Sequence, residues 1–213
     1  MIKFFNITDR ESVEYLEAVE VYKAGTPEGL QIKSEEIEKK IDSGNAVIIL
    51  GKQNILPVFM ALLWKLEGSN YYVNEIISII PSVKHLPFGK IYLEVLKASE
   101  YIKNNHILFE VEDPDFGNKE ERQKKLDFYF THGLSLVNDV KTIVPSPNGE
   151  EHTNTLLCIL SNSRFLKISQ KEIKDLITKL YADLYQQEPE GYLLKSILEN
   201  VPEEIRLLGF MKC

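Results

Sequence analysis

Three glutamates lie in segments whose neighbours favour β-strands, and they are the clearest candidates for acid–base chemistry. Glu75 is enclosed by apolar residues in the run YYVNEIISII. A carboxylate buried among apolar groups needs a compensating reason, so we expect Glu75 to be functional. Glu110 and Glu112 are two residues apart, a spacing that puts both side chains on one face of a strand. A carboxylate in such a position can act as a general base.

Other reactive residue types give no comparable signal. Cys158 lies in an apolar run and is expected to be a packing residue. Cys158 and Cys213 form neither a CxxC pattern nor a Cys/His ligand spacing, so we expect no metal site and no disulfide framework. His132 directly precedes Gly133 at an expected helix end, where a histidine interacts favourably with the helix dipole. The sequence also lacks a GxSxG nucleophile motif.

Composition excludes several classes of protein. The chain has 213 residues, 44% of them hydrophobic and 27% charged, which is typical of one globular core with an appendage. Its net charge of -7 argues against a nucleic acid partner. The N-terminal residues MIKFFNITDRE contain no apolar region of a signal peptide, and runs such as Ala46–Leu50 are too short to span a bilayer. We therefore expect a cytoplasmic protein without a membrane partner.

The spacing of apolar residues predicts alternating strands and helices. Thr8 and Glu11 form a potential capping box, which predicts the start of the first helix. The expected apolar face of that helix consists of Val13, Leu16, Val19 and Tyr22. Strands are expected at residues 2–5, 46–50, 55–66, 71–80, 106–112, 134–143 and 155–161, and further helices at 34–43, 89–104 and 118–132. Tight turns join the second to fourth strands into an antiparallel meander, and a strand–helix–strand unit follows it, so the pattern predicts an α/β or α+β fold.

The C-terminal part of the chain has a different character. Ser169 and Glu172 form a second potential capping box, followed by apolar residues at helical spacing through Leu184. A shorter helix is expected near 192–200. We divide the chain into a domain of residues 1–165 and a helical extension of residues 166–213. The apolar stripe of the extension is expected to pack on the sheet or on a partner, because it is too regular to be left in water.

The segment Tyr72–Lys97 resembles the acyl-CoA motif of the GNAT superfamily of N-acetyltransferases, and the likeness in pattern extends over roughly residues 1–162. In that motif a strand ends in a proline, and a glycine-containing loop then aims backbone N–H groups at the pyrophosphate of CoA. Lys84 takes the Gln/Arg position of the loop and Gly89 its last small position, but Pro87 replaces a glycine and has no N–H. The resemblance assigns to the cofactor Ser78, Ile79, Ile80, Lys84, His85, Phe88, Gly89 and Lys90. The alternative is an ordinary strand, loop and helix with a proline at the helix start.

Two further stretches carry the same resemblance. The strand end EVEDP at residues 110–114 is similar to the E-x-E-x-P pattern of a bacterial GNAT subgroup, and Glu75 matches a glutamate in that subgroup's strand. This implies Glu110 and Glu112 as binding residues for an amine substrate. The segment RQKKLDFYFTHGL resembles the helix that closes the GNAT site, and its Tyr129 falls where a tyrosine often protonates the departing thiolate. Tyr129 could instead be a core aromatic.

The resemblance implies a GNAT-like mixed, mostly antiparallel sheet with helices on both faces and a central strand–helix–strand unit. The implied activity is the transfer of an acetyl or other short acyl group from acyl-CoA to an amine of a small molecule or peptide. Glu75 would be the general base, a backbone N–H near Ser78 and Ile79 would polarise the thioester carbonyl, and Tyr129 would be the acid. The alternatives are a non-catalytic module that binds acyl-CoA or a protein partner, and an adaptor without CoA. A homodimer is one assembly that the sequence leaves open.

Overall fold

The computed structural model describes residues 2–145, 152–162, 167–188 and 190–209. The chain forms two compact units, which are described separately. The first unit consists of Met1–Glu67 and Tyr72–Glu100, and the second of Gly68–Tyr71 and Tyr101–Cys213. Cys213 and residues 146–151, between the last two predicted strands, lie outside the described residues.

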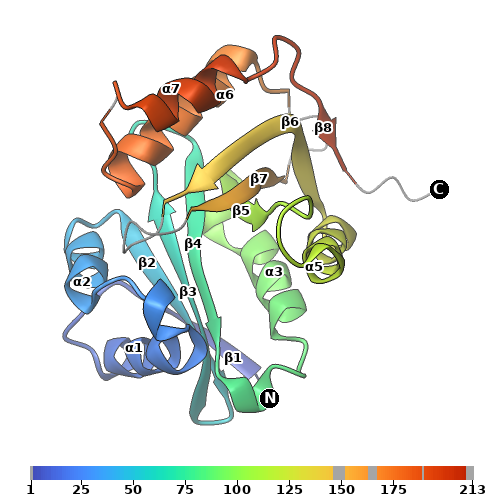
Figure 1. Cartoon of the computed structure of the whole chain (residues 1–213). Helices are drawn as coiled ribbons and strands as arrows, with labels where there is room; N and C mark the ends of the chain where they lie inside the picture. Colours follow the sequence, from blue (N-terminus) through green and yellow to red (C-terminus); the bar gives the residue numbers. More distant parts are fainter. Residues whose placement is uncertain (1, 146–151, 163–166, 189, 210–213) are drawn as a thin grey trace. The chain divides into compact units, whose positions relative to one another are not determined.

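The first unit is built on a four-stranded antiparallel meander (Figure 1). Its strands follow one another in the order β1, β2, β3 and β4, each antiparallel to its neighbour. Their bounds are β1 (Ile2–Ile7), β2 (Ala46–Gln53), β3 (Leu56–Lys65) and β4 (Tyr71–Ile79). The central strands β2 and β3 are almost continuously apolar, because helices cover both of their faces.

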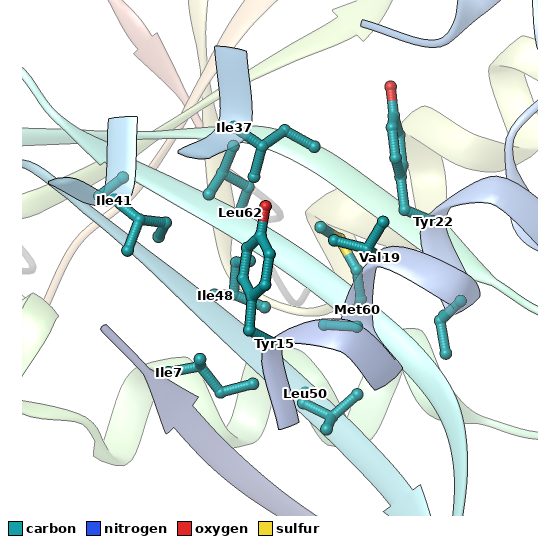
Figure 2. Packing of buried hydrophobic residues seen from close by; sticks show 13 residues of the cluster. Ile7, Tyr15, Val19, Tyr22, Ile37, Ile41, Ile48, Leu50, Met60 and Leu62 are labelled. Atoms are coloured by element: carbon teal, nitrogen blue, oxygen red, sulfur yellow. The ribbon is translucent and has the colours of Figure 1, made fainter. Parts of the chain in front are cut away.

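The helices of the first unit pack on both sides of this meander. They are α1 (Val13–Gly25), η1 (Glu28–Leu30), α2 (Ser34–Asp42), η2 (Pro81–Val83) and α3 (Phe88–Ala98). Side chains of α1 and α2, such as Tyr15 and Ile37, pack with Met60 and Leu62 of β3 (Figure 2). Phe59 points to the opposite face, where it stacks on Phe88 of α3 at 6.4 Å between ring centroids.

The start and the buried face of α1 differ from the sequence-based prediction. The cap is Ser12, whose Oγ accepts a hydrogen bond from the N–H of Tyr15 at 3.2 Å, and the predicted box at Thr8 and Glu11 does not form the helix start. Leu16 is 60% exposed. The buried side chains of α1 are Tyr15, Ala18, Val19, Val21 and Tyr22. Val19 and Tyr22 are buried as predicted, whereas Tyr15 and Ala18 take the places expected for Val13 and Leu16, because packing on the sheet decides which side of the helix is covered.

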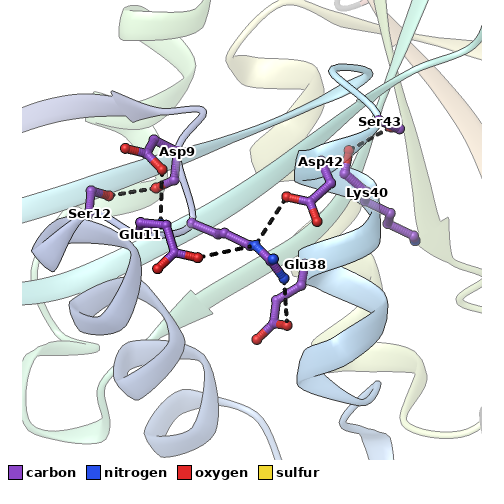
Figure 3. A network of polar contacts seen from close by, with 8 residues as sticks. Asp9, Glu11, Ser12, Glu38, Lys40, Asp42 and Ser43 are labelled. Carbon is purple, nitrogen blue, oxygen red and sulfur yellow. Dashed lines mark hydrogen bonds and ion pairs between the residues drawn. The ribbon is translucent and has the colours of Figure 1, made fainter.

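A cluster of charged side chains holds α2 beside the start of α1 (Figure 3). Arg10 lies 3.3 Å from Glu38 and 3.2 Å from Asp42, both on α2. It also contacts Glu11 at 3.4 Å. These pairs are at the surface and each contributes little to stability, about 0–1 kcal/mol. Their importance is that they orient α2, which brings Lys40 to the candidate site.

The second unit contains the last strand of the predicted strand–helix–strand unit and three further strands. Its strands lie in the order β5, β7, β6 and β8, and each pair is antiparallel. The elements are α4 (Glu100–Lys103), at the point where the chain divides, β5 (His106–Glu112), α5 (Lys119–Thr131), β6 (Leu134–Val144), β7 (Thr153–Leu160) and β8 (Leu207–Leu208). Asn118 caps α5 by accepting from the N–H of Glu121, as the sequence predicts. The short strand β8 is not predicted by the sequence.

The C-terminal helices are docked within the second unit, as expected from their apolar stripe. They are α6 (Gln170–Lys179), the π-helical turn η3 (Leu180–Leu184) and α7 (Tyr192–Glu199). The capping box of Ser169 and Glu172 is present. Ile173, Ile177 and Tyr181 are fully buried. The predicted boundary at 165/166 falls at residues 163–166, outside the described part of the chain, so the division into a domain and an extension remains a prediction.

The predicted fold class is confirmed: an α/β chain with a mostly antiparallel sheet and helices on both faces. In the described part of the chain, no helix has the length and apolar character needed to cross a membrane.

Candidate functional site

Glu75 is the residue that interrupts the pairing of β3 with β4. Leu62 pairs with Ile76 and Leu63 pairs with Asn74, so Glu75 has no partner in β3 and forms a β-bulge. A bulge bends the strand and re-aims the extra side chain, and bulges are common beside active sites. The Glu75 side chain contacts Lys40 of α2, so it lies on the α1/α2 face of β4.

The Glu75 carboxylate is buried and only half satisfied. Its Oε1 accepts a hydrogen bond from Lys40 Nζ, and both side chains are only 12% exposed. Its Oε2 is buried and has no hydrogen-bond partner among the described residues. Burial raises the pKa of Glu75, the charge and the hydrogen bond of Lys40 oppose this rise, and Glu36 adds to it. A raised pKa brings a carboxylate closer to the range in which it can take and return a proton at neutral pH.

The end of β4 is held by the C-terminus of α1. The Ser78 side chain is buried and hydrogen-bonded to Thr26. The N–H of Ile80 donates to Val58 of β3 at 3.1 Å. Because successive N–H groups of a strand point to opposite edges, the N–H of Ile79 points to the edge of β4 that faces away from β3. Of the three residues predicted here, Ile79 therefore offers the backbone donor.

The loop after β4 leads into the N-terminus of α3, as predicted. Lys84, His85 and Lys90 are exposed around it. The N–H groups of Gly89 and Lys90 have no backbone partner among the described residues, and no side chain caps the helix. The side chain of Phe88 is buried in the core and its N–H donates to Leu86, so Phe88 can contribute little to a ligand. Two free donors and the helix dipole remain for an anion.

Pro87 is the residue that precedes α3. Its carbonyl accepts from the N–H of Ile91 at 3.1 Å, which is the first hydrogen bond of the helix. The proline therefore starts α3 without distorting it, and the loop lacks one donor at this position.

Tyr129 lies on α5 in the second unit, with its ring against Phe109 and Phe128 at 5.5 Å. It is 9% exposed. Burial raises its pKa to about 12, with smaller contributions from Cys158 and Glu112. Its hydroxyl makes no hydrogen bond to another residue of the described chain. The ring is thus packed in the core, as in the alternative that Tyr129 is a core aromatic. The hydroxyl, however, makes no hydrogen bond to the backbone of the described residues.

Glu110 and Glu112 lie on β5 in the second unit but have different surroundings. Glu110 accepts hydrogen bonds from Thr142 at 3.1 Å and from Tyr185, which follows η3. Glu112 is paired with Arg122 at 3.4 Å and Lys125 at 3.1 Å, both on α5. These cations compensate its charge, which weakens the case for Glu112 as a binding residue for an amine.

Two residues that contact predicted site residues are not found by the sequence reasoning. Lys40 pairs with Glu75, and Tyr185 donates to Glu110. Lys40 follows Ile37 by three residues, which places it beside the apolar stripe of α2. A lysine at that position is a usable signal for a buried ion pair. Tyr185 follows a π-helical turn, whose formation the sequence does not reveal.

Cys158 and His132 have structural roles. The Cys158 thiol is buried, and burial raises its pKa to about 12, so it is not a nucleophile at neutral pH. His132 caps the end of α5 through a hydrogen bond of its Nδ1 with the carbonyl of Phe128 at 2.7 Å. Within the described residues, no group of three or more His, Cys, Asp or Glu side chains is placed to hold a metal ion.

Comparison with solved structures identifies a shared fold, whereas no protein-family model and no curated protein matches the sequence. A candidate GNAT-family acetyltransferase from Bacteroides thetaiotaomicron superposes with a TM-score of 0.71 at 22% identity, covering 87% of this chain and 99% of that one. The ribosomal-protein-S18-alanine N-acetyltransferase from Escherichia coli gives 0.57 at 14%, covering 79% and 100%. An N-acetyltransferase from Staphylococcus aureus gives 0.56 at 11%, covering 76% and 97%. The chain therefore has the fold of the GNAT acetyltransferases.

Proposed function

We propose that this chain is an acyl-CoA-dependent N-acyltransferase that transfers an acetyl or other short acyl group to an amine. The observation that carries the proposal is the segment from β4 to α3. It combines a bulged strand bearing Glu75, an outward N–H at Ile79, and an uncapped helix N-terminus beside exposed Lys84, His85 and Lys90. This is the arrangement needed to hold a thioester and a pyrophosphate.

The donor side of the proposed reaction uses groups of the first unit. The N–H groups of Gly89 and Lys90 bind pyrophosphate oxygens, and the nearby cationic side chains add charge-assisted hydrogen bonds. The Ile79 N–H hydrogen-bonds to the thioester carbonyl and stabilises the oxyanion that forms during attack. Glu75 accepts the proton that the acceptor ammonium must lose, directly or through one water molecule.

Tyr129 is proposed to assist departure of CoA by hydrogen bonding to its sulfur. The phenol has a pKa of about 12 and stays protonated at neutral pH. A thiol has a pKa of about 8.5, so full proton transfer from this phenol to the thiolate is uphill by about 5 kcal/mol. A strong hydrogen bond to the developing charge needs no such transfer. Of the two glutamates of β5, we propose Glu110 for recognition of the acceptor.

The alternative function is a module without turnover that binds acyl-CoA or a protein partner, and Pro87 is the observation that favours it. Each hydrogen bond to a charged group contributes about 1.5–3 kcal/mol, so the missing donor weakens pyrophosphate binding. The two free donors of α3 still permit binding. Turnover therefore separates the enzyme from a module that binds acyl-CoA.

Calorimetry with acetyl-CoA tests the proposal. We expect binding, and a rise in melting temperature that corresponds to about 2.7 kcal/mol at a ligand concentration of 100 times Kd. Replacing both Lys84 and Lys90 by Glu should weaken binding at least about tenfold, because two cations near the pyrophosphate become anions. Lys39→Glu, an exposed change on α2, is the control.

A thiol-release assay with a panel of amines then separates catalysis from binding. Release that requires both acetyl-CoA and an amine supports transfer. Binding without release supports the non-catalytic module. If millimolar acetyl-CoA neither binds nor stabilises the protein, both functions are wrong.

A further inference from the structure

The Lys40–Glu75 ion pair is buried, and burial of an ion pair does not by itself explain why the pair exists. The desolvation of two charges offsets most of their attraction, and packed apolar residues in the same place would often be at least as stable. The pair sits at the bulge of β4, where the carboxylate is displaced from regular pairing. Its position therefore calls for a chemical explanation.

Lys40 is fixed from two directions. Its ammonium group contacts Glu75 Oε1 and lies 5.3 Å from the centroid of the Trp64 ring on β3. An ammonium over an indole face is attracted by the ring quadrupole. On the same helix, Glu38 and Asp42 are paired with Arg10, so α2 itself is anchored (Figure 3). The lysine is held against the carboxylate and is not a mobile surface charge.

The polar atoms around the pair are incompletely satisfied. Glu75 Oε2 and Trp64 Nε1 are both buried, and neither has a hydrogen-bond partner in the described part of the chain. Both side chains contact the same ammonium group. One carboxylate oxygen is thus occupied by Lys40, and the other is buried without a hydrogen-bond partner among the described residues.

We propose that Lys40 is a positioning residue for Glu75: its ammonium group favours the ionised form of the buried carboxylate and binds one of its oxygens, which leaves the second oxygen unpaired to accept a proton. The proposal rests on the proposed function for its catalytic meaning. Without a cation beside it, a carboxylate buried at this depth would hold its proton and could not act as a base. Lys40 opposes this effect, so it favours the form of Glu75 that can accept a proton.

The charged and titratable groups that act on Glu75 come from two helices. Lys40 and Glu36 lie on α2, and Tyr22 lies on α1. Lys40 lowers the pKa of Glu75, whereas burial and Glu36 raise it. The Tyr22 hydroxyl accepts a hydrogen bond from the N–H of Ile32 at 2.7 Å, and burial raises its pKa, so Tyr22 is neutral over the relevant pH range. Of these groups, Lys40 is therefore the one whose removal should change the pKa of Glu75 most.

The test is the pKa of Glu75, measured by carbon-13 NMR of the side-chain carboxyl group and assigned with Glu75→Gln. Lys40→Met keeps the length of the side chain and removes its charge. We expect the Glu75 pKa to rise by about one pH unit or more, since an adjacent opposite charge shifts a carboxylate by about 1–3 units. In Lys40→Arg, which keeps the positive charge, the pKa of Glu75 should stay close to the wild-type value. Lys39→Met, an equal charge change at an exposed position of α2, should leave it unchanged.

An unchanged Glu75 pKa in folded Lys40→Met would overturn the proposal. If Lys40→Met does not fold, the wild-type protein provides the second measurement. The nitrogen-15 resonance of Lys40 Nζ should then show a step at the pH where Glu75 titrates, and a flat Lys40 signal through that pH would overturn the proposal equally.

Turnover provides a separate readout. With a working amine, the acidic limb of the pH profile of kcat/KM should move to higher pH in Lys40→Met by the amount that NMR reports, and not in Lys39→Met. A purely structural lysine would lower stability without moving that limb. If the NMR shift is present and no amine is ever acylated, the coupling stands and the proposed function fails.

Discussion

At the scale of single residues, the chemistry of the candidate groups follows from what surrounds each of them. Tyr129 has a buried ring, an uncommitted hydroxyl and a pKa of about 12. Glu75 has one oxygen paired with Lys40 and one unpaired. Glu112 has two cations beside it. Glu75 and Glu112 thus differ in chemical properties although both are glutamates, because their burial and neighbouring charges differ.

Tyr129→Phe isolates the hydroxyl from the ring. We expect little change in stability or acetyl-CoA affinity, because the packing on Phe109 and Phe128 survives and no described hydrogen bond is lost. Turnover should fall about 10²–10³-fold, mainly in kcat, if the hydroxyl hydrogen-bonds to the charge that develops on the departing sulfur. Thiol release measured under saturating acetyl-CoA checks this. Wild-type kcat in the variant would remove Tyr129 from the proposed mechanism.

At the scale of elements, close approach of backbones positions the end of β4. Gly25, the last residue of α1, lies directly against Ile79: an added Cβ would be 2.8 Å from the carbonyl oxygen and 2.9 Å from the nitrogen of Ile79. A side chain there would displace the backbone whose N–H is the proposed carbonyl donor. The glycine is thus required by packing between α1 and β4.

Gly25→Ala should destabilise the protein by about 1–3 kcal/mol, the usual cost of overpacking, and should weaken acetyl-CoA binding. In an unconstrained helix the same change would stabilise by up to about 1 kcal/mol, so the sign of the effect decides between the two explanations. Gly29→Ala is the control, because a Cβ there meets nothing within 4 Å. Urea unfolding of both variants provides the comparison.

The C-terminal helices are attached to the second unit through a specific polar contact as well as through apolar burial. The Tyr181 hydroxyl accepts from the N–H of Ile143 at 2.8 Å and donates to its carbonyl. Both backbone groups of one β6 residue are therefore satisfied by a side chain of η3. The π-helical turn sets the position of this ring and of Tyr185, whose ring centroid is 5.4 Å away.

Tyr181→Phe should cost about 1–3 kcal/mol, because it leaves the N–H and the carbonyl of Ile143 without that partner. Tyr192→Phe removes the same hydroxyl from a side chain that is 88% exposed, and should have almost no effect. Thermal unfolding followed by circular dichroism measures both. Equal stability of the two variants would mean that the contact with Ile143 contributes nothing to docking.

At the scale of the whole molecule, the stability of this acidic chain depends on how its buried carboxylates are compensated. Asp113 directly follows the end of β5 and is only 2% exposed. Lys141 lies 2.8 Å from its Oδ2, and its Oδ1 accepts from the N–H of Asp115. Burial pushes the pKa of Asp113 up, but the hydrogen bonds from Lys141 and Asp115 and the charges of Lys141 and Arg122 together hold it below its ordinary value.

This lowered pKa predicts a particular dependence of stability on pH. A carboxyl group with a folded-state pKa below its unfolded value of about 3.9 stabilises the protein above that value, and the contribution is lost as the pH falls through the folded-state pKa. Asp113→Asn should therefore be less stable than wild type at pH 7, by about 1–2 kcal/mol. The difference in stability should begin to shrink as the pH falls below about 4 and should vanish below the folded-state pKa.

Denaturant unfolding at several pH values measures this convergence. Asp183→Asn removes an exposed carboxylate of η3 and is the control. Its free energy of unfolding should follow that of wild type at every pH. A difference for Asp113→Asn that stays constant down to acid pH would mean that the effect is packing and not ionisation.

The sequence by itself determined the features that depend on local interactions. The caps at Asn118 and Ser169, the strand β5 and the apolar stripe of α6 were predicted, because their hydrogen bonds or spacing lie within a few residues. The motif around the start of α3 led to the GNAT fold, which the solved structures share. Caps and apolar stripes depend on residues close together in the chain, so they can be predicted from one sequence.

Only the tertiary structure decided the features that depend on distant neighbours. On α1, Val19 and Tyr22 could share a buried face with Val13 and Leu16 or with Tyr15 and Ala18, and packing on β2 and β3 selects the second pair. The bulge at Glu75 follows from register across β3, and its partner Lys40 lies 35 residues away in the chain. The strand β8 needs the edge of β6 to pair with. Burial and long-range pairing set these choices, because their free energies exceed the small local preferences that a sequence pattern can show.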